Sequence, residues 1–187
     1  MSMPEARHRS PARERGLSLI ELIMFIIIVA IGVTALLAVF STTVRKSADP
    51  MIEKQMLAIA ESLLEEVEGK PFTYCDPDDA NAVTATSAAG CTTPEGIGTE
   101  GAETRSGGTP FDNVSDYNGY AVSPYTDLTG TTTIAGYSAS VSVANSTALN
   151  GLASSEALLI TVTVIGPGNA SLSLQGYRTR YAPNAVP

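Results

Sequence analysis

The sequence predicts an α+β protein, with a long hydrophobic N-terminal helix and a C-terminal antiparallel β-sheet packed on the second half of that helix. Two patterns predict it. Residues 22–40 are apolar except for Gly32 and Thr34, which is a run long enough for a membrane-length helix. Residues 137–143 and 158–164 alternate apolar and polar side chains, as strands with one buried face do.

The apolar run predicts a single membrane crossing. Together with residues 17–21 it makes a helix of roughly 36 Å at about 1.5 Å per residue, enough to span a bilayer. The arginines that precede it predict a cytoplasmic N-terminus and an exported body: they are Arg7, Arg9, Arg13 and Arg15. A plain signal-anchor is the alternative interpretation of this run. An ordinary secretory signal fits less well, because no convincing small-x-small cleavage site follows the run.

A second amphipathic helix is expected from Pro50 to Glu68, with Asp49 as its N-cap and with Gly69 and Pro71 ending it. Its apolar residues recur at steps of three and four and should form one buried stripe: Ile52, Met56, Ile59, Leu63 and Val67. The sequence leaves open whether the two helices form one rod or two pieces.

The expected sheet comes from the last third of the chain. Its inward side chains should be those at alternate positions: Tyr137, Ala139, Val141, Val143, Leu158, Ile160, Val162, Val164, Leu172 and Leu174. The alternation changes parity at Gly176, which suggests a bulge, so that Tyr177, Thr179 and Tyr181 become the expected inward set. The apolar stripe of the second helix should cover this sheet.

Cys75 and Cys91 are the only cysteines, and an even number in an exported chain suggests a disulfide, with two unrelated buried thiols as the alternative. The bond would tie down part of an irregular loop over residues 75–110. The expected organisation is therefore a leader at 1–16, a membrane and assembly helix at 17–48, and an α+β body at 49–187.

Acidic residues form two small groups in this part of the chain. Asp76, Asp78 and Asp79 are weak calcium candidates, and Asp112 with Asp116 forms the other group. A solvated acidic loop in which Asp residues serve turns is the plainer interpretation. We therefore expect no metal and no cofactor.

Charge and composition argue against two classes of function. The net charge of −8 and the lack of a basic stripe argue against nucleic-acid binding. The only histidine, His8, lies in the leader, so Ser/His/Asp and Cys/His catalysis and histidine-ligated zinc are not expected in the body. We expect no enzyme activity.

The motif that indicates a function runs from Gly16 to Glu21. A carboxylate inside the start of a membrane-spanning run is unfavourable and calls for a partner. Cleavage after Gly16 would create one, because it would free the α-amino group of Leu17 four residues before Glu21.

This motif resembles the type IV prepilin signature, in which a short basic leader ends in Gly and Glu stands at the fifth position of an apolar helix. The resemblance implies that a prepilin peptidase cuts between Gly16 and Leu17 and methylates the amino group of Leu17. It also implies that Glu21 meets the amino terminus of a neighbouring pilin subunit. Leu17 departs from the usual Phe, and Ala38 stands where many major pilins have proline.

Residues 47–50, 58–66, 71–79 and 111–119 resemble minor pilins of the mannose-sensitive haemagglutinin (MSHA) type of pilus. This resemblance implies a subunit held in the inner membrane, with other pilins, the peptidase and membrane lipid as partners, and then carried to the pilus on the cell surface. A surface ligand is left open. The alternatives are a type II secretion pseudopilin and a signal-anchored periplasmic binding protein that uses the 76–110 loop.

Overall fold

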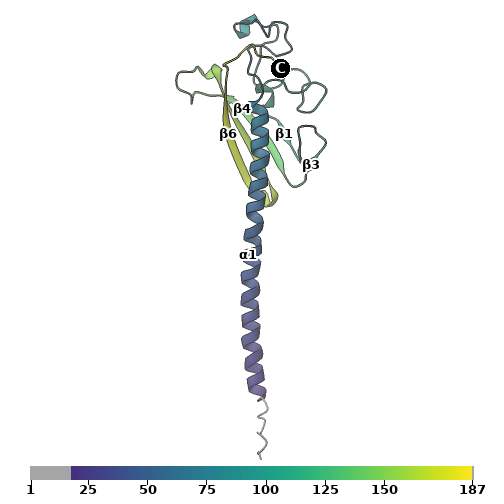
Figure 1. Ribbon diagram of the computed structural model, residues 1–187, viewed down its shortest axis with the longest axis vertical. Coiled ribbons are helices and arrows are strands. Elements are labelled where there is room, and N and C mark those ends of the chain that lie inside the picture. The colour runs from purple at the N-terminus through teal and green to yellow at the C-terminus, as the bar shows by residue number, and fades with distance from the viewer. Residues whose placement is uncertain (1–17, 187) are drawn as a thin grey trace, which may run out of the picture. The chain divides into compact units, whose positions relative to one another are not determined.

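The computed structural model describes residues 18–186, without the side chains of residues 42–49. The chain divides into two compact units, Met1–Ser47 and Ala48–Pro187, which are taken separately below. One helical element, α1 (Leu19–Glu68), contributes to both (Figure 1). The expected leader and the expected cleavage residues Gly16 and Leu17 lie outside the described residues.

In the first unit, α1 contains one stretch that is long and apolar enough to cross a membrane, Leu19–Ser41. Its two hydroxyl side chains, Thr34 and Ser41, form hydrogen bonds within the helix. The hydroxyl of Thr34 donates to the carbonyl oxygen of Ala30 at 2.6 Å, and that of Ser41 donates to the carbonyl oxygen of Ala38 at 2.9 Å. Hydroxyls that bond back to the preceding turn are compatible with an apolar surrounding.

The start expected for a second helix is wrong. Asp49 and Pro50 are both helical, and Pro50 lies inside α1. A proline inside a helix removes one backbone hydrogen bond and its ring crowds the carbonyl four residues earlier, so the helical position of Pro50 costs about 3 kcal/mol relative to a first-turn position. The expected end is confirmed, because α1 stops at Glu68 and the amide of Gly69 donates to the carbonyl oxygen of Glu65 at 2.9 Å.

The body contains a four-stranded antiparallel sheet in the order β1–β4–β5–β6 and a separate two-stranded hairpin of β2 and β3 (Figure 1). Residues 146–156 join β4 to β5 and residues 166–170 join β5 to β6, and in both pairs the strands run antiparallel. The elements are β1 (Ala121–Val122), β2 (Tyr125–Thr126), β3 (Thr133–Ile134), β4 (Ser138–Asn145), β5 (Ala157–Ile165) and β6 (Ser171–Thr179).

The body's core lies between the sheet and α1, which confirms the expected α+β fold (Figure 1). Leu63 and Val67 of the helical stripe are fully buried, as are Ile160 and Val162 of β5. The alternation of buried and more exposed residues expected for β4 and β5 is confirmed along both strands. The rest of the expected stripe is buried as well, except for Ile52, which is partly buried.

The parity change expected in β6 is wrong. The pairing of β5 with β6 is regular, Ile160 lies opposite Gly176, and Gly176 is buried on the inner face. A Cβ on Gly176 would lie 3.1 Å from Leu64 Cδ1 and closer still to Glu68, both of α1. The glycine therefore allows the helix to approach the strand, while Tyr177 and Tyr181 are exposed.

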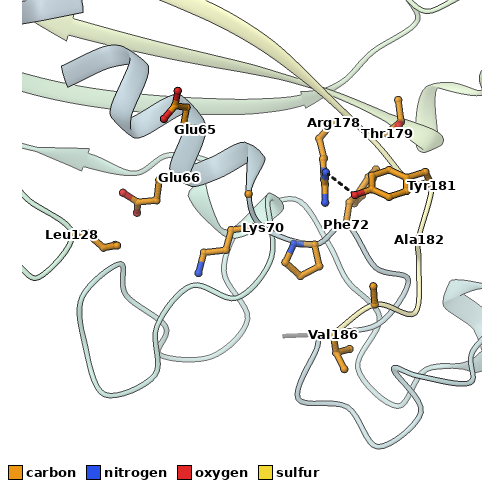
Figure 2. Close-up of a pocket in the computed structure, with 13 residues that line it drawn as sticks. Glu65, Glu66, Lys70, Phe72, Leu128, Arg178, Thr179, Tyr181, Ala182 and Val186 are labelled. Atoms are coloured by element: carbon orange, nitrogen blue, oxygen red, sulfur yellow. Dashed lines mark hydrogen bonds between the residues drawn. The ribbon is translucent and has the colours of Figure 1, made fainter. Parts of the chain in front are cut away.

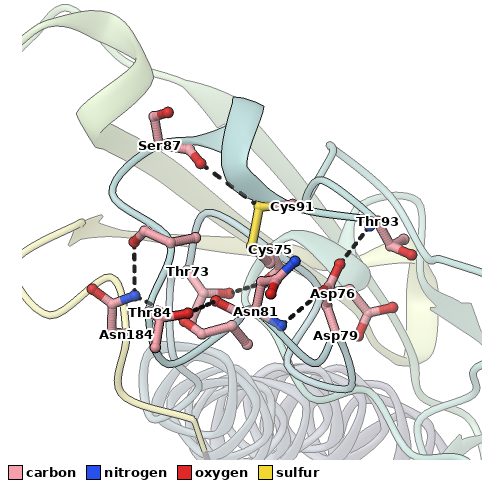
Figure 3. The surroundings of a disulfide bond; sticks show 12 residues. Thr73, Cys75, Asp76, Asp79, Asn81, Thr84, Ser87, Cys91, Thr93 and Asn184 are labelled. Atoms are coloured by element: carbon pink, nitrogen blue, oxygen red, sulfur yellow. Dashed lines mark hydrogen bonds between the residues drawn. A yellow bond between two sulfur atoms is a disulfide. The ribbon is translucent and has the colours of Figure 1, made fainter.

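The segment between α1 and β1 is irregular but ordered. Cys75 and Cys91 form a disulfide, as expected, and Cys75 is fully buried in a small apolar cluster with Ala82 and Ala85 (Figure 3). The side-chain amide of Asn184 donates to the carbonyl oxygens of Ala82 and Ala85, both at 2.8 Å. The C-terminal tail is thus fastened to the disulfide loop.

Candidate functional site

The N-terminal part of α1 is apolar on every side, with Glu21 in its first turn. Glu21 is exposed, and so are the large apolar side chains around it. A helix that is apolar all round is typical of a membrane span or of a helix covered by other chains. The exposed residues are Leu19, Ile20, Leu22, Ile23, Met24, Phe25, Ile26, Ile27, Ile28, Val29, Ile31, Val33, Leu36, Leu37, Val39 and Phe40.

A cluster of carboxylates lies in the loop region of the body. Three overlapping groups each place one oxygen per residue within 4.8 Å of the others: Asp76 with Asp78 and Asp112, Glu103 with Asp112 and Asp116, and Glu95 with Glu100 and Asp116. We call these seven residues the acidic cluster. Asp112 and Asp116 each belong to two groups, so they join the three groups into one continuous cluster.

Asp116 is the buried centre of the acidic cluster, with 1% of its surface exposed. Its Oδ2 accepts hydrogen bonds from the amides of Asp112 and Asn113 at 2.9 and 2.7 Å. Its Oδ1 is buried without a partner among the described residues, and the same holds for Glu95 Oε2 and Glu103 Oε2. Buried carboxylate oxygens without partners are costly unless something else satisfies them.

The cluster lacks ion pairs to balance its charge within the part of the chain that the structure describes. Burial raises the pKa of Glu95 to about 9 and that of Asp116 to about 7, with neighbouring carboxylates adding to both shifts. Burial followed by nearby carboxylates also raises the pKa of Glu103 to about 7 and that of Asp112 to about 6. The charged form of these carboxyl groups is therefore disfavoured by burial and by the carboxylates around them.

The calcium candidates expected from the sequence are only partly brought together. Asp76 and Asp78 belong to the acidic cluster, whereas Asp79 does not. Asp79 instead serves the loop backbone, because its carboxylate accepts from the amides of Asn81 at 2.8 Å and Thr93 at 2.5 Å. These hydrogen bonds, that from Thr93 first, lower the pKa of Asp79.

A second charged site joins α1 to the loop and to the β2–β3 hairpin. Arg105, buried at its side chain, donates to both carboxylate oxygens of Glu66, with Nη2 at 2.6 Å from Oε2 and Nε at 2.9 Å from Oε1. It also donates to the carbonyl oxygen of Thr126 at 2.8 Å, and the hydroxyl of Tyr117 donates to Glu66 Oε1 at 2.8 Å. Burial alone would lower the pKa of Arg105, but its hydrogen bonds to Glu66 and Tyr120 raise it.

A cavity of about 570 Å³ lies beside the C-terminal end of α1 (Figure 2). Its lining includes Glu65, Lys70, Phe72, Arg178 and Tyr181, and Arg178 Nη1 donates to the Tyr181 hydroxyl at 3.3 Å.

The sequence analysis did not identify three glutamates of the acidic cluster or the buried Arg105 as candidate site residues. Glu95, Glu100 and Glu103 are scattered in a Gly/Thr/Ala-rich segment, and only the folding of that loop brings them to Asp116. Arg105 is an isolated basic residue in an acidic body, and that isolation was the one available signal of a buried ion pair.

No known protein family, curated protein or solved structure matches this chain.

Proposed function

We propose that the chain is a minor pilin subunit of an MSHA-type pilus, held in the inner membrane and assembled into a filament, and that it is not an enzyme. The observation that carries the proposal is the position of Glu21. It lies in the first turn of α1, shortly after the Gly16–Leu17 motif, and residues 22–40 that follow it are apolar except for Gly32 and Thr34. A carboxylate at that place is unfavourable in lipid and needs a positively charged partner. The amino terminus of a neighbouring subunit would supply one.

The apolar surface of the helix supports the same proposal. Its large side chains are exposed around the whole circumference from Leu19 to Phe40, more than a single contact with this chain's own body could cover. Lipid would cover them before assembly, and the helices of neighbouring subunits would cover them in a filament. The acidic body, with its sheet and disulfide loop, would then form the outer part of that filament.

Mass spectrometry of the mature protein tests the proposal. We expect a chain that begins at Leu17 and carries an N-methyl group, because the peptidase would cut after Gly16 and modify the new terminus. The variant Gly16→Asp should remain uncut in the membrane. Ser10→Ala, a change within the leader but away from the cleavage site, should be processed like the wild type.

The competing functions give different results in the same experiment. A mature protein that keeps residues 1–16 would overturn the proposal and favour a signal-anchored binding protein. Cleavage and methylation followed by recovery of the subunit only with a type II secretion pseudopilus, and never in sheared pili, would identify a pseudopilin instead.

A further inference from the structure

We propose that the body binds a calcium ion at a site centred on Asp116, which forms one group of carboxylates with Glu103 and Asp112 and a second group with Glu95 and Glu100. This inference goes beyond the proposed role in a pilus and does not depend on it. The site brings together the irregular loop after the disulfide and the short 3₁₀ helix Ser115–Tyr117, through carboxylate oxygens that lie within 4.8 Å of one another in each group.

Unpartnered oxygens distinguish this site from an ordinary acidic loop. Asp116 is almost completely buried and its Oδ1 has no partner among the described residues, although Oδ2 receives two amide hydrogen bonds. Glu95 is arranged in the same way, since Oε1 accepts from the hydroxyl of Ser115 while Oε2 is buried and unpartnered. One oxygen of each residue thus holds the carboxylate in place, and the other is free for a ligand.

The surrounding contacts hold the ligands in position before any ion binds. The Gly96 amide donates to Glu100 Oε1 at 3.0 Å, the Gly98 amide donates to the carbonyl oxygen of Ser115 at 3.1 Å, and the Glu95 amide donates to that of Tyr74 at 2.9 Å. These bonds fasten the glutamate-bearing loop to the segments on either side. Ligands that are already positioned lose less entropy when an ion binds.

The ligand chemistry selects the ion. All the candidate ligands are carboxylate oxygens, which suit hard cations rather than zinc or copper. The three carboxylates of one group, together with backbone carbonyls and water, can supply the six to eight oxygens, in flexible geometry, that Ca²⁺ takes, whereas Mg²⁺ demands near-ideal octahedral geometry and keeps several waters. A cavity of about 310 Å³ lined by Asp78, Glu103 and Asp112 offers a path from solvent.

The charge balance points the same way. Burial and mutual repulsion raise the pKa of four of these carboxyl groups, Glu95, Glu103, Asp112 and Asp116. Lys70 lowers the pKa of Asp112, but burial and neighbouring carboxylates raise it more, and the Lys70 ammonium donates to the carbonyl oxygen of Phe111 at 2.7 Å. A divalent cation would neutralise the cluster and satisfy its free oxygens together.

Calorimetric titration of the full chain in detergent tests the proposal, after chelator treatment and at about 0.15 M NaCl to screen diffuse attraction. We expect saturable Ca²⁺ binding with a Kd of about 10⁻⁴ to 10⁻³ M, the range of extracellular calcium modules, and clearly weaker Mg²⁺ binding. At calcium ten times Kd, the melting temperature should rise by about 3–6 °C.

The variants Glu103→Gln and Asp116→Asn should each weaken Ca²⁺ binding by about tenfold or more, because each removes one charged ligand. Glu61→Gln is the matched control, since Glu61 is exposed on α1 outside the cluster, and it should bind like the wild type. If Asp116→Asn fails to fold, Glu103→Gln still decides the matter. Absence of saturable binding up to about 10 mM Ca²⁺, or equal binding by Glu103→Gln and Glu61→Gln, would overturn the site.

Discussion

Glu66 shows how one residue's surroundings decide its energetic role. The sequence places Glu65 and Glu66 side by side at the polar end of an amphipathic helix, where both are expected to be solvated. In the structure Glu65 is exposed, while the Glu66 side chain is only 10% exposed and is held by Arg105 and Tyr117. Our expectation that Glu66 is an exposed charge is therefore wrong.

Replacing Glu66 should be far more damaging than replacing Glu65. Glu66→Ala leaves the Arg105 side chain, which is 3% exposed, without its carboxylate, and breaking a buried pair from one side costs about 3–5 kcal/mol. Glu65→Ala should change the free energy of unfolding by less than about 0.5 kcal/mol. Denaturant unfolding of the unit that starts at Ala48 measures both, and equal midpoints would contradict the role of the pair.

At the scale of elements, the body depends on the seating of α1 on the sheet and on the fastening of the loop between α1 and β1. Gly176 of β6 and the apolar stripe of α1 together determine how α1 packs on the sheet. The absence of a side chain on Gly176 lets Leu64 and Glu68 approach β6, while Leu63 and Val67 fill the space over β5. The loop depends instead on its disulfide, on Arg105 and on the acidic cluster.

Shortening a central residue of the stripe should destabilise the body. Leu63 is fully buried between α1 and the sheet, so Leu63→Ala loses transfer free energy and leaves a cavity, at a cost of about 2–5 kcal/mol. Ile59→Ala should fall in the same range. Leu57 lies on the same helix but is 37% exposed, so Leu57→Ala should cost much less. If Leu63→Ala and Leu57→Ala unfold at the same denaturant concentration, the proposed packing of the helix is wrong.

Removing the disulfide should loosen the loop more than the core. Cys75→Ser opens a covalent ring spanning a sequence separation of 16 residues, worth about 3 kcal/mol in the chain-entropy model. We expect limited proteolysis to cut residues 76–110 faster in this variant, with the α1 and sheet fragments preserved. Alkylation of unreduced wild-type protein supplies the control, because two reactive thiols per chain would mean that no bond forms.

At the scale of the whole molecule, the chain combines a helix that requires an apolar environment with a body that has its own core. The two compact units differ in kind, since the large apolar residues of the first are exposed and those of the second are largely buried. An exposed apolar helix of this kind is typical of a membrane span or of a helix covered by other chains. The proposed pilin role makes use of both properties.

A substitution at Glu21 tests membrane insertion and filament assembly separately. Glu21→Ala should insert into the membrane at least as well as the wild type, because it removes a carboxylate from an apolar stretch, while its amount in sheared filaments should fall. Thr34→Ala is a suitable control, since the Thr34 hydroxyl is satisfied within its own helix and its loss should not affect assembly. Quantitative immunoblotting of membranes and filaments measures both steps. Wild-type amounts of Glu21→Ala in filaments would refute the assembly role.

The sequence by itself determined the elements whose signal is local. The apolar run, the stripe of α1 and the alternation along β4 and β5 follow from the spacing of side chains along one segment, and the end of the helix at Glu68 follows from Gly69 and Pro71. The cysteine pair belongs here too, because with two cysteines only one pairing exists.

Tertiary structure alone decided the features that depend on segments distant in sequence. Gly176 continues the inward set of Leu172 and Leu174, and it lacks a side chain where α1 passes closely, so the parity change inferred from the residues after it was wrong. Likewise, Glu66 is separated by 39 residues from Arg105, and Asp116 meets Glu95 only because the loop folds back. Electrostatic partners and close approaches depend on distance in space, and a linear pattern records only distance along the chain.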